Sequence, residues 1–451
     1  MTFTDELRAR FEDAGQGHVF AHVDSLEPEA AARFAAELAE VDLELVGRLA
    51  AVLEVPDGAA ADPKLEPCIV INGAEPAEEE WIAGTLSLAA GEVGFVLVAG
   101  GQGSRLGFDG PKGAFPVGPL TDRTLFDWHA GRILAAGRRH GFRPTWAVMT
   151  SRTNDEATRA FFAENDHFGM PAEDVWFFSQ DMLPALDEGG RILLSGPGEL
   201  FLAPNGHGGT LQALSKSGVL GRFAERGVKT LSYFQVDNPL ARPADPLFVG
   251  HHVRNGSEMS SKVVPKRDPM EKVGVLGLVD GVLGCIEYSD LSEELRETRT
   301  ADGDLVFNAG NIAVHMIDIG FVERLNAGGD LDLPWHVARK RISTIDDAGA
   351  PIQVDGVKFE TFVFDALGRA KATVTLEVDR AEEFSPVKNA EGADSPATCR
   401  ADLSRLGRSI IGRSGDTVEV DPRAAETADE FAERGLSVIE RAGGLLVEPG
   451  A

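Results

Sequence analysis

From Gly94 onward, short apolar runs alternate with amphipathic segments along most of this 451-residue chain. Apolar runs of strand length, separated by segments of helical periodicity, are typical of a parallel sheet whose faces are covered by helices. The predicted strands are Phe95–Val98, Thr145–Thr150, Val175–Phe178, Thr230–Val236, Val273–Val279 and Ile312–His315. Helices are predicted between them, among them Leu125–Gly137, Asn154–Asn165 and Leu211–Arg226. The sequence therefore predicts an α/β domain built on a mostly parallel sheet.

The two ends of the chain depart from this pattern. Asp5–Asp13 and Pro28–Glu54 carry apolar residues at three- and four-residue spacing and are rich in Ala, Leu and Glu, which predicts helices. Beyond Phe384 the chain is polar and then contains short β-like segments, Thr417–Val420 and Leu445–Val447. Because 451 residues exceed a typical domain, we predict three parts: a helical region over 1–90, a central α/β domain over 91–385 and a small C-terminal β region over 386–451.

Composition excludes several classes of protein. A formal net charge of -29 would repel nucleic acid and anionic membranes. No apolar stretch approaches the length of a membrane-spanning helix, and the first residues have neither a basic lead nor an apolar signal segment, so we expect a cytoplasmic protein. Cys68, Cys285 and Cys399 lie far apart without a CxxC pair, which argues against disulfides and a thiolate zinc site and predicts buried, inert thiols. The sequence leaves the oligomeric state open.

A cluster of glycines follows the first predicted strand of the central domain. Residues 98–107 read VAGGQGSRLG, and residues 110–113 read GPKG. Glycines after a strand let the backbone approach a ligand and direct N–H groups at phosphate oxygens, while Arg105 and Lys112 add positive charge. The string is not a Walker A loop, because Lys112 follows proline and no Ser or Thr comes next, and Leu106 breaks the G-x-G-x-x-G pattern. It suits a nucleoside triphosphate; the alternative is a flexible turn.

One carboxylate stands where a predicted strand ends. Asp237 precedes Asn238-Pro239, and a carboxylate at the carboxyl end of a strand can hold Mg²⁺ together with phosphate oxygens. The alternative is that Asp237 caps a turn or a helix. No second carboxylate ligand can be located, and Asp302-Gly303-Asp304 has the pattern of a turn.

Six further segments accompany the glycine cluster in a recognisable order. With them the chain resembles the UDP-sugar pyrophosphorylases through most of residues 90 to 400, and most closely the eukaryotic-type UDP-N-acetylhexosamine pyrophosphorylases. The segments are Phe177-Phe178-Ser179-Gln180-Asp181-Met182-Leu183-Pro184, Ala203-Pro204-Asn205-Gly206-His207-Gly208-Gly209, Val236-Asp237-Asn238, Ile286-Glu287-Tyr288-Ser289, Phe307-Asn308-Ala309-Gly310-Asn311 and Phe384-Ser385-Pro386-Val387-Lys388-Asn389.

The resemblance implies a fold and a set of site residues. The fold would be a doubly wound, mostly parallel, Rossmann-type sheet of the GT-A-like kind found in nucleotide-diphospho-sugar transferases. The resemblance assigns the nucleotide to the backbone of Ala99, Gly100 and Gly101 and to Gln180 and Gly206, and a Mg²⁺ (or Mn²⁺) ion to Asp237. It assigns catalytic charge to Arg105, Lys112, Lys358 and Lys388, and the sugar to His207, Glu287, Asn308, Phe362 and Phe364. By pattern alone, Phe362 and Phe364 alternate on an apparent strand and would ordinarily be core residues. The alternative for the polar residues is an ordinary exposed side chain: Gln180, Glu287, Asn308, Lys358 and Lys388.

The implied reaction joins UTP to a sugar 1-phosphate and releases a UDP-sugar and pyrophosphate. The sugar phosphate is already an anion, so catalysis reduces to alignment and charge stabilisation, without a general base or a covalent enzyme intermediate. A glycosyltransferase is disfavoured because Val236-Asp237-Asn238 lacks an Asp-x-Asp motif. A non-catalytic nucleotide-sugar sensor is disfavoured because it would have no use for Arg105, Lys112 and the other two lysines.

The choice of sugar depends on one turn. Residues 206–209 read GHGG, whereas the N-acetylhexosamine enzymes usually carry Asn at the second place and the glucose and broad-specificity branches resemble Gly-His-Gly. His207 could crowd a 2-acetamido group, donate to a sugar hydroxyl, or form an indifferent wall. The segments at Glu287 and Asn308 follow the N-acetylhexosamine pattern unchanged, so we predict N-acetylglucosamine 1-phosphate over glucose 1-phosphate.

Overall fold

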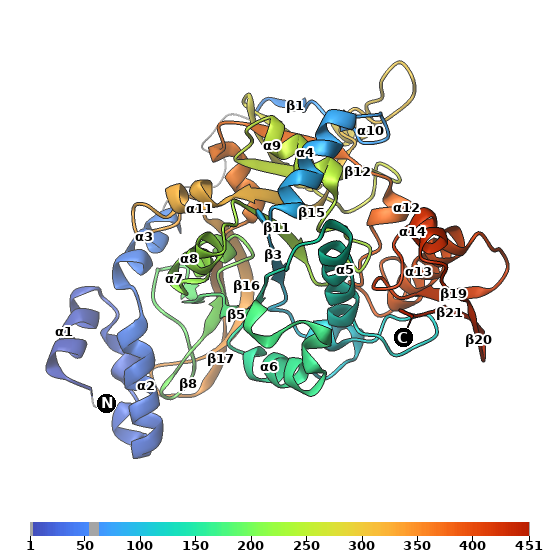
Figure 1. The fold of residues 1–451 in the computed structure, drawn as a ribbon. Coiled ribbons are helices and arrows are strands. Elements are labelled where there is room, and N and C mark those ends of the chain that lie inside the picture. The colour runs from blue at the N-terminus through green and yellow to red at the C-terminus, as the bar shows by residue number, and fades with distance from the viewer. Residues whose placement is uncertain (1–2, 54–62, 451) are drawn as a thin grey trace. The chain divides into compact units, whose positions relative to one another are not determined.

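The computed structural model describes residues 3–53 and 63–450 (Figure 1). The chain forms two compact units, each assembled from three separated segments. The smaller unit combines Met1–Pro63, Gln180–Gly209 and Leu333–Val363, and the larger combines Lys64–Ser179, Thr210–Asp332 and Phe364–Ala451. The boundaries predicted at residues 90 and 385 divide the chain into consecutive parts and remain predictions.

The larger unit is built on a sheet that has eleven strands within the described residues. Its main path runs β2-β18-β12-β15-β11-β3-β4-β5, and β1, β13 and β14 are attached at its side. Neighbours on the main path are parallel except β15, which is antiparallel to both β11 and β12. The strands are β1 Leu65–Pro67, β2 Ile71–Asn72, β3 Val93–Val98, β4 Trp146–Thr150, β5 Val175–Ser179, β11 Thr230–Gln235, β12 Met259–Pro265, β13 Val275–Val279, β14 Val282–Ile286, β15 Ala309–Asp318 and β18 Thr373–Glu377. The predicted α/β class and mostly parallel sheet are confirmed.

Helices accompany this sheet, and Figure 1 shows α4 and α9 side by side. They are α4 Glu78–Ala89, α5 Leu125–His140, α6 Asp155–Glu164, α7 Gly209–Lys216, α8 Val219–Glu225, α9 Pro246–Arg254, α10 Glu293–Glu297, α11 Ile319–Leu325, α12 Arg380–Glu383, α13 Pro396–Ile411 and α14 Ala428–Glu433. The single helix predicted over Leu211–Arg226 is wrong, because Gly218 has a φ of +76° and separates α7 from α8. Among the described residues, no helix is both long and apolar enough to cross a membrane.

The C-terminal region of the larger unit contains more helix than predicted. The strands predicted at Thr417–Val420 and Leu445–Val447 are confirmed as β19 (Thr417–Val420) and β21 (Gly444–Val447), which pair in parallel, with β20 (Ile439–Arg441) beside β21. Helix α13 packs against β19 and was missed. Its sequence signal is a capping box, in which the Ser395 and Thr398 side chains each bind the other's backbone N–H.

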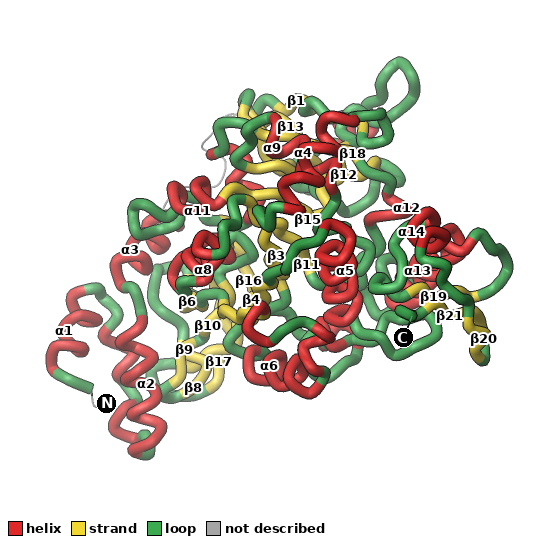
Figure 2. The backbone as a smooth tube through the Cα atoms, viewed as in Figure 1, coloured by secondary structure: helices red, strands yellow, loops and turns green. Residues whose placement is uncertain are grey.

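The smaller unit packs N-terminal helices against short strands from later in the chain (Figure 2). Its helices are α1 Asp5–Asp13, α2 Pro28–Glu40 and α3 Leu43–Leu53, and its strands are β6 Met182–Pro184, β7 Leu186–Asp187, β8 Leu194–Gly196, β9 Glu199–Leu200, β10 Leu202–Pro204, β16 His336–Ile345 and β17 Pro351–Glu360. The predicted helix Pro28–Glu54 divides into α2 and α3, because the Asp42 carboxylate accepts the Leu45 N–H at 2.9 Å and starts a new helix; Glu54 lies outside the described residues.

Candidate active site

The strands of the large sheet bring several motif segments to one edge. Val98 at the end of β3 pairs with Gln235 at the end of β11 and with Met149 of β4, all in parallel. Their carboxyl ends therefore share one edge of the sheet, where ligands bind in open α/β folds. Strand β15 runs the opposite way, and its first residue, Ala309, pairs with Pro265 at the end of β12. Asn308 accordingly lies at this same edge.

The glycine loop after β3 folds back on itself. The Gly103 N–H donates to Gly110 O at 2.9 Å, and the Lys112 N–H donates to Gly101 O at 3.1 Å. Between these contacts Ser104–Leu106 forms a turn of 3₁₀ helix, and the Arg105 side chain is exposed at its tip. The fold-back brings Lys112 next to the start of the loop, although eleven positions separate it from Gly101.

Two residues that were not predicted from the sequence donate hydrogen bonds to the carbonyl groups of the glycine loop. The Ser151 hydroxyl donates to Gly100 O at 2.7 Å, and the Asn154 amide donates to Ala99 O at 2.8 Å and to Gly101 O at 3.2 Å. The Ala99 N–H is already used by Met149 O. Within the described part of the chain, the N–H groups of Gly100 and Gly101 make no hydrogen bond. They can therefore donate to a bound anion. The sequence feature that could have indicated Ser151 and Asn154 is the run of polar residues directly after β4.

Replacing Asn154 with alanine is expected to weaken both folding and nucleotide binding. The buried Ala99 carbonyl would lose its donor, which typically costs about 1–3 kcal/mol, and Gly101 O would keep only the Lys112 N–H, so the loop would lose part of its fixed shape. Urea unfolding and the KM for UTP measure the two effects. Asn165→Ala is the matched control, because Asn165 ends the same helix and donates only to Phe161 O. An unchanged KM for UTP in Asn154→Ala would contradict this role.

A lysine–carboxylate pair joins the glycine loop to the end of β11. Lys112 Nζ lies 3.2 Å from Asp237 Oδ2, and the two side chains are only 18% and 12% exposed. The Asp237 carbonyl accepts the Val387 N–H at 2.9 Å. Asn238 donates to Glu383 O and accepts the Ser385 N–H. Three motif segments, the glycine loop, 236–238 and 384–389, therefore meet.

Lys388 belongs to the third of these segments, 384–389. Its side chain is exposed, its N–H donates to Asp394 O at 2.7 Å, and its Nζ lies 5.6 Å from the centre of the Phe384 ring. A cavity of about 360 Å³ beside Phe384 and Ser385 has a lining of mixed charge, with Arg267, Arg380, Asp379, Asp394 and Asp402.

The donor set around Asp237 fits one kind of metal. Among the described residues, no group of three or more His, Cys, Asp and Glu side chains is arranged to hold an ion. A single carboxylate fits Mg²⁺, which takes one or two carboxylates and completes its shell with phosphate oxygens and water, and it does not fit zinc. Asp302-Gly303-Asp304 is a turn, as predicted: the Gly303 N–H donates to Thr300 O at 3.1 Å.

The three cysteines are free thiols, as predicted, but only Cys399 is fully buried. Burial raises the pKa of Cys68 and Cys285 and raises that of Cys399 to about 12. All three are therefore protonated near neutral pH, when a thiol is a poor nucleophile.

Two predicted sugar ligands belong to the larger unit. The Asn308 side-chain oxygen accepts the Lys266 N–H at 2.8 Å, so the amide's acceptor is engaged by the backbone and its NH₂ group remains the donor for a ligand. Glu287 directly follows Ile286, whose partner Val275 pairs in turn with Gly310. Glu287 and Asn308 thus follow or precede neighbouring strands of the sheet.

The smaller unit contains Gln180, Gly206, His207, Lys358 and Phe362, whereas Phe364 belongs to the larger unit. Gly206 has a φ of +82°, and a Cβ there would lie 2.4 Å from Thr361 O, so only glycine fits this turn. His207 Nδ1 accepts the Val363 N–H at 3.2 Å, which places the proton of a neutral ring on Nε2. The His207 ring stacks on the Phe362 ring with 5.3 Å between the ring centres, and the His336 ring packs on Phe362 with 4.4 Å between the ring centres.

The strand predicted through Phe362 and Phe364 is wrong. Strand β17 ends at Glu360, and Val363–Arg369 is a 3₁₀ helix, because Thr361 turns away to bind Asn205: its N–H donates to Asn205 O at 2.8 Å. Phe364 is buried at 8% exposure. Lys358 stands on β17 with its Nζ 5.0 Å from the centre of the Phe201 ring, and Gln180 directly follows β5.

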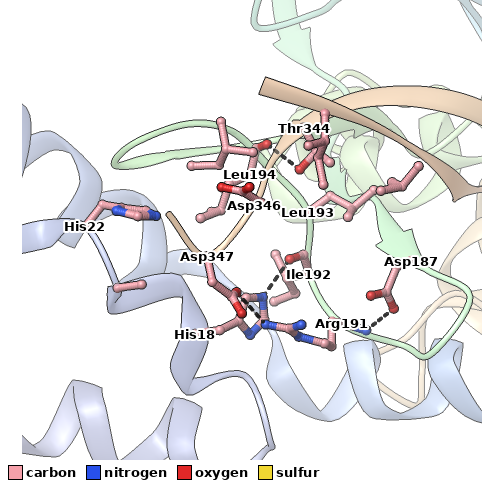
Figure 3. A pocket seen from close by; sticks show the side chains of 14 residues that line it. His18, His22, Asp187, Arg191, Ile192, Leu193, Leu194, Thr344, Asp346 and Asp347 are labelled. Carbon is pink, nitrogen blue, oxygen red and sulfur yellow. Dashed lines mark hydrogen bonds and ion pairs between the residues drawn. The ribbon is translucent and has the colours of Figure 1, made fainter. Parts of the chain in front are cut away.

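A separate cavity of about 220 Å³ in the smaller unit contains none of these residues (Figure 3). Its polar groups bind the protein itself: His18 contacts Ile192 O at 2.8 Å, and Thr344 donates to Leu194 O at 2.8 Å. Arg191 pairs with Asp347 at 3.3 Å. Burial lowers the pKa of His18 below its usual value, so its ring is mostly neutral near pH 7. These contacts indicate that the polar groups around the cavity stabilise the smaller unit and do not form a binding site.

Comparison with known proteins adds to this geometry. The model of the family described as UTP–glucose-1-phosphate uridylyltransferase matches residues 80–394. The chain is 38% identical to human UDP-N-acetylhexosamine pyrophosphorylase-like protein 1, over 89% of this chain and 84% of the relative. It is 34% identical to UDP-N-acetylglucosamine pyrophosphorylase of Saccharomyces cerevisiae, over 84% and 83%. The crystal structure of the Trypanosoma brucei uridine diphosphate N-acetylglucosamine pyrophosphorylase superposes with a TM-score of 0.82 at 26% identity, over 96% and 95%.

Proposed function

Because the chain belongs to the UTP–glucose-1-phosphate uridylyltransferase family, we propose that it transfers the uridylyl group of UTP to a sugar 1-phosphate, with N-acetylglucosamine 1-phosphate as its preferred acceptor. The products are a UDP-sugar and pyrophosphate. The observation that carries the proposal is the Lys112–Asp237 pair, at the sheet edge where the glycine loop ends. We further propose that the sheet is doubly wound and GT-A-like and that the reaction takes place in the cytoplasm.

The chemistry needs alignment and charge more than proton transfer. An oxygen of the sugar phosphate attacks the α-phosphorus of UTP, and the bond from that phosphorus to the bridging oxygen of pyrophosphate breaks. Lys112, Arg105 and Lys358 neutralise the triphosphate, and Lys388 positions the attacking phosphate. Asp237 would hold Mg²⁺ (or Mn²⁺), which supplies positive charge to the phosphate oxygens. The amides of Gly100 and Gly101 and the Ala99 backbone would bind the nucleotide, with Gln180 and Gly206 at the uracil.

The sugar assignment is supported by the names of the relatives and by the polar groups of Asn308 and Glu287. The relatives at 38% and 34% identity are named UDP-N-acetylhexosamine pyrophosphorylase-like protein 1 and UDP-N-acetylglucosamine pyrophosphorylase. Asn308 presents an amide NH₂ group, and Glu287 a carboxylate, for the sugar. The His207 ring is held in place, because it stacks on Phe362 and its Nδ1 accepts the Val363 N–H, and we propose that this fixed ring faces the sugar.

A pyrophosphate-release assay with both sugar phosphates tests this assignment. We expect kcat/KM to be higher for N-acetylglucosamine 1-phosphate than for glucose 1-phosphate by about tenfold or more, since a polar group left unpaired in a pocket costs a few kcal/mol. His207→Asn is expected to shift this ratio. A parent protein that prefers glucose 1-phosphate would overturn the assignment, and an unchanged ratio in His207→Asn would remove His207 from it. Release of UDP from an added UDP-sugar, without pyrophosphate release from UTP, would indicate a glycosyltransferase, and absence of turnover with both would indicate a sensor.

A further inference from the structure

Helix α5 holds both ends of the turn that carries Asp237. His129 Nε2 donates to Val236 O at 3.0 Å, and Arg132 Nε donates to Pro239 O at 2.8 Å. The two residues lie one helical turn apart and are 0% and 4% exposed. Burial lowers the pKa of His129 to about 4, so its ring is neutral near pH 7. The two carbonyl groups that flank Asp237-Asn238 are thus bound to one face of one helix.

The second contact of Arg132 leads to the C-terminal region. Arg132 Nη1 lies 3.0 Å from Glu426 Oε1, and the Glu426 side chain is only 13% exposed. Glu426 stands just before α14, in the part of the chain beyond the match to the family model. A buried guanidinium needs a charged partner, because removing one member of such a pair leaves the other uncompensated.

We propose that Arg132, held by Glu426, is a positioning residue for the Asp237 carboxylate, through which the C-terminal region fixes the metal and triphosphate site. The inference rests on the proposed function, which assigns Mg²⁺ to Asp237. Lys112, Val387 and the Asn238 side chain hold the turn from the other sides. With α5 released, the turn can move away from these contacts, and outer residues that orient a metal ligand typically contribute about 10–100-fold to metal affinity.

The test compares two arginines of α5 that share one partner. Arg132→Met removes the contacts with Pro239 O and Glu426. Arg139→Met is the control, because Arg139 pairs with the same Glu426 at 2.9 Å and with Glu430 at 2.6 Å but does not contact the turn. The measured quantity is the Mg²⁺ concentration that gives half-maximal binding of UTP in calorimetric titrations, together with the KM for UTP. Arg132→Met is expected to raise that concentration by about 10–100-fold, and Arg139→Met to leave it within about twofold.

An equal effect of both substitutions, or no effect of Arg132→Met, would overturn the proposal. If Arg132→Met does not fold, Arg132→Lys serves, since an ammonium keeps the charge but cannot reach both partners with the fork of a guanidinium. It should raise the Mg²⁺ requirement in a protein that still folds, and a normal requirement would again overturn the role. A parent protein that binds UTP with Mg²⁺ but releases no pyrophosphate would contradict the proposed function instead.

Discussion

Lys112→Ala is expected to lower kcat by about 10²–10³-fold, because a charge aimed at the reacting phosphates typically contributes about 3–4 kcal/mol in the transition state. Lys112 is suited to this role, since its ammonium is mostly buried and fixed by Asp237 at 3.2 Å. Arg105→Ala should also lower kcat by orders of magnitude. Single-turnover and steady-state pyrophosphate release measure the loss, and circular dichroism shows whether the fold is kept.

Two controls sharpen this experiment. Lys229→Ala removes a lysine whose Nζ pairs with Glu92 at 2.5 Å and whose side chain is 69% exposed, so turnover should stay normal. Lys112→Arg keeps the charge but changes the reach and should recover part of the rate. Near-normal turnover in Lys112→Ala would mean that the ion pair with Asp237 is structural only.

Removal of divalent metal is expected to abolish turnover, and addition of Mg²⁺ to restore it. Asp237→Asn keeps the size of the side chain but removes the negative charge, so it should raise the Mg²⁺ concentration for half-maximal turnover by at least about tenfold and lower kcat. The measurement is a Mg²⁺ titration of the parent and of Asp237→Asn after treatment with a chelator. Zinc should not substitute, because a site of oxygen ligands favours hard cations.

This result also separates two roles of Asp237. Lys112 would lose its partner in Asp237→Asn, so part of any loss in kcat could come from a displaced lysine. Metal dependence distinguishes them: a displaced lysine lowers kcat at every Mg²⁺ concentration, whereas a lost ligand shifts the titration. Full activity in chelator, or the parent's titration curve in Asp237→Asn, would contradict the metal assignment.

The strands under the site could be predicted from the sequence, because β3 is a short apolar run and β11 is rich in residues that favour strands. The contact of Lys112 with Asp237 could not be derived from spacing, since 125 positions separate them. Their shared role came from the resemblance of short motifs. Ser151 and Asn154 escaped because their function depends on β4 lying beside β3, which is a fact of the sheet rather than of the local sequence.

The errors have local physical causes. Pro28–Glu40 and Leu43–Leu53 share one apolar periodicity, so only the Asp42 cap distinguishes two helices from one. Phe362 and Phe364 alternate as on a strand, but hydrogen bonds to Asn205 end the strand before them. The assembly of each unit from three segments leaves no trace in composition, because it results from packing between residues far apart in the chain.

The three-segment core of the smaller unit also decides the order in which the chain can fold while it is being made. Phe11 and Phe34 near the start of the chain pack in one cluster with Ile192 and with Phe359. At typical rates of synthesis the last of these residues leaves the ribosome roughly tens of seconds after the first. During that interval α1 and α2 can pack only on each other and on neighbouring residues, as the Phe11–Phe20 and Phe3–Phe34 ring contacts allow, and the rest of their apolar surface lacks its later partners. The helices that are made first are therefore among the last to be packed, while β3, β4 and β5 of the larger unit can pair as soon as residue 179 has emerged.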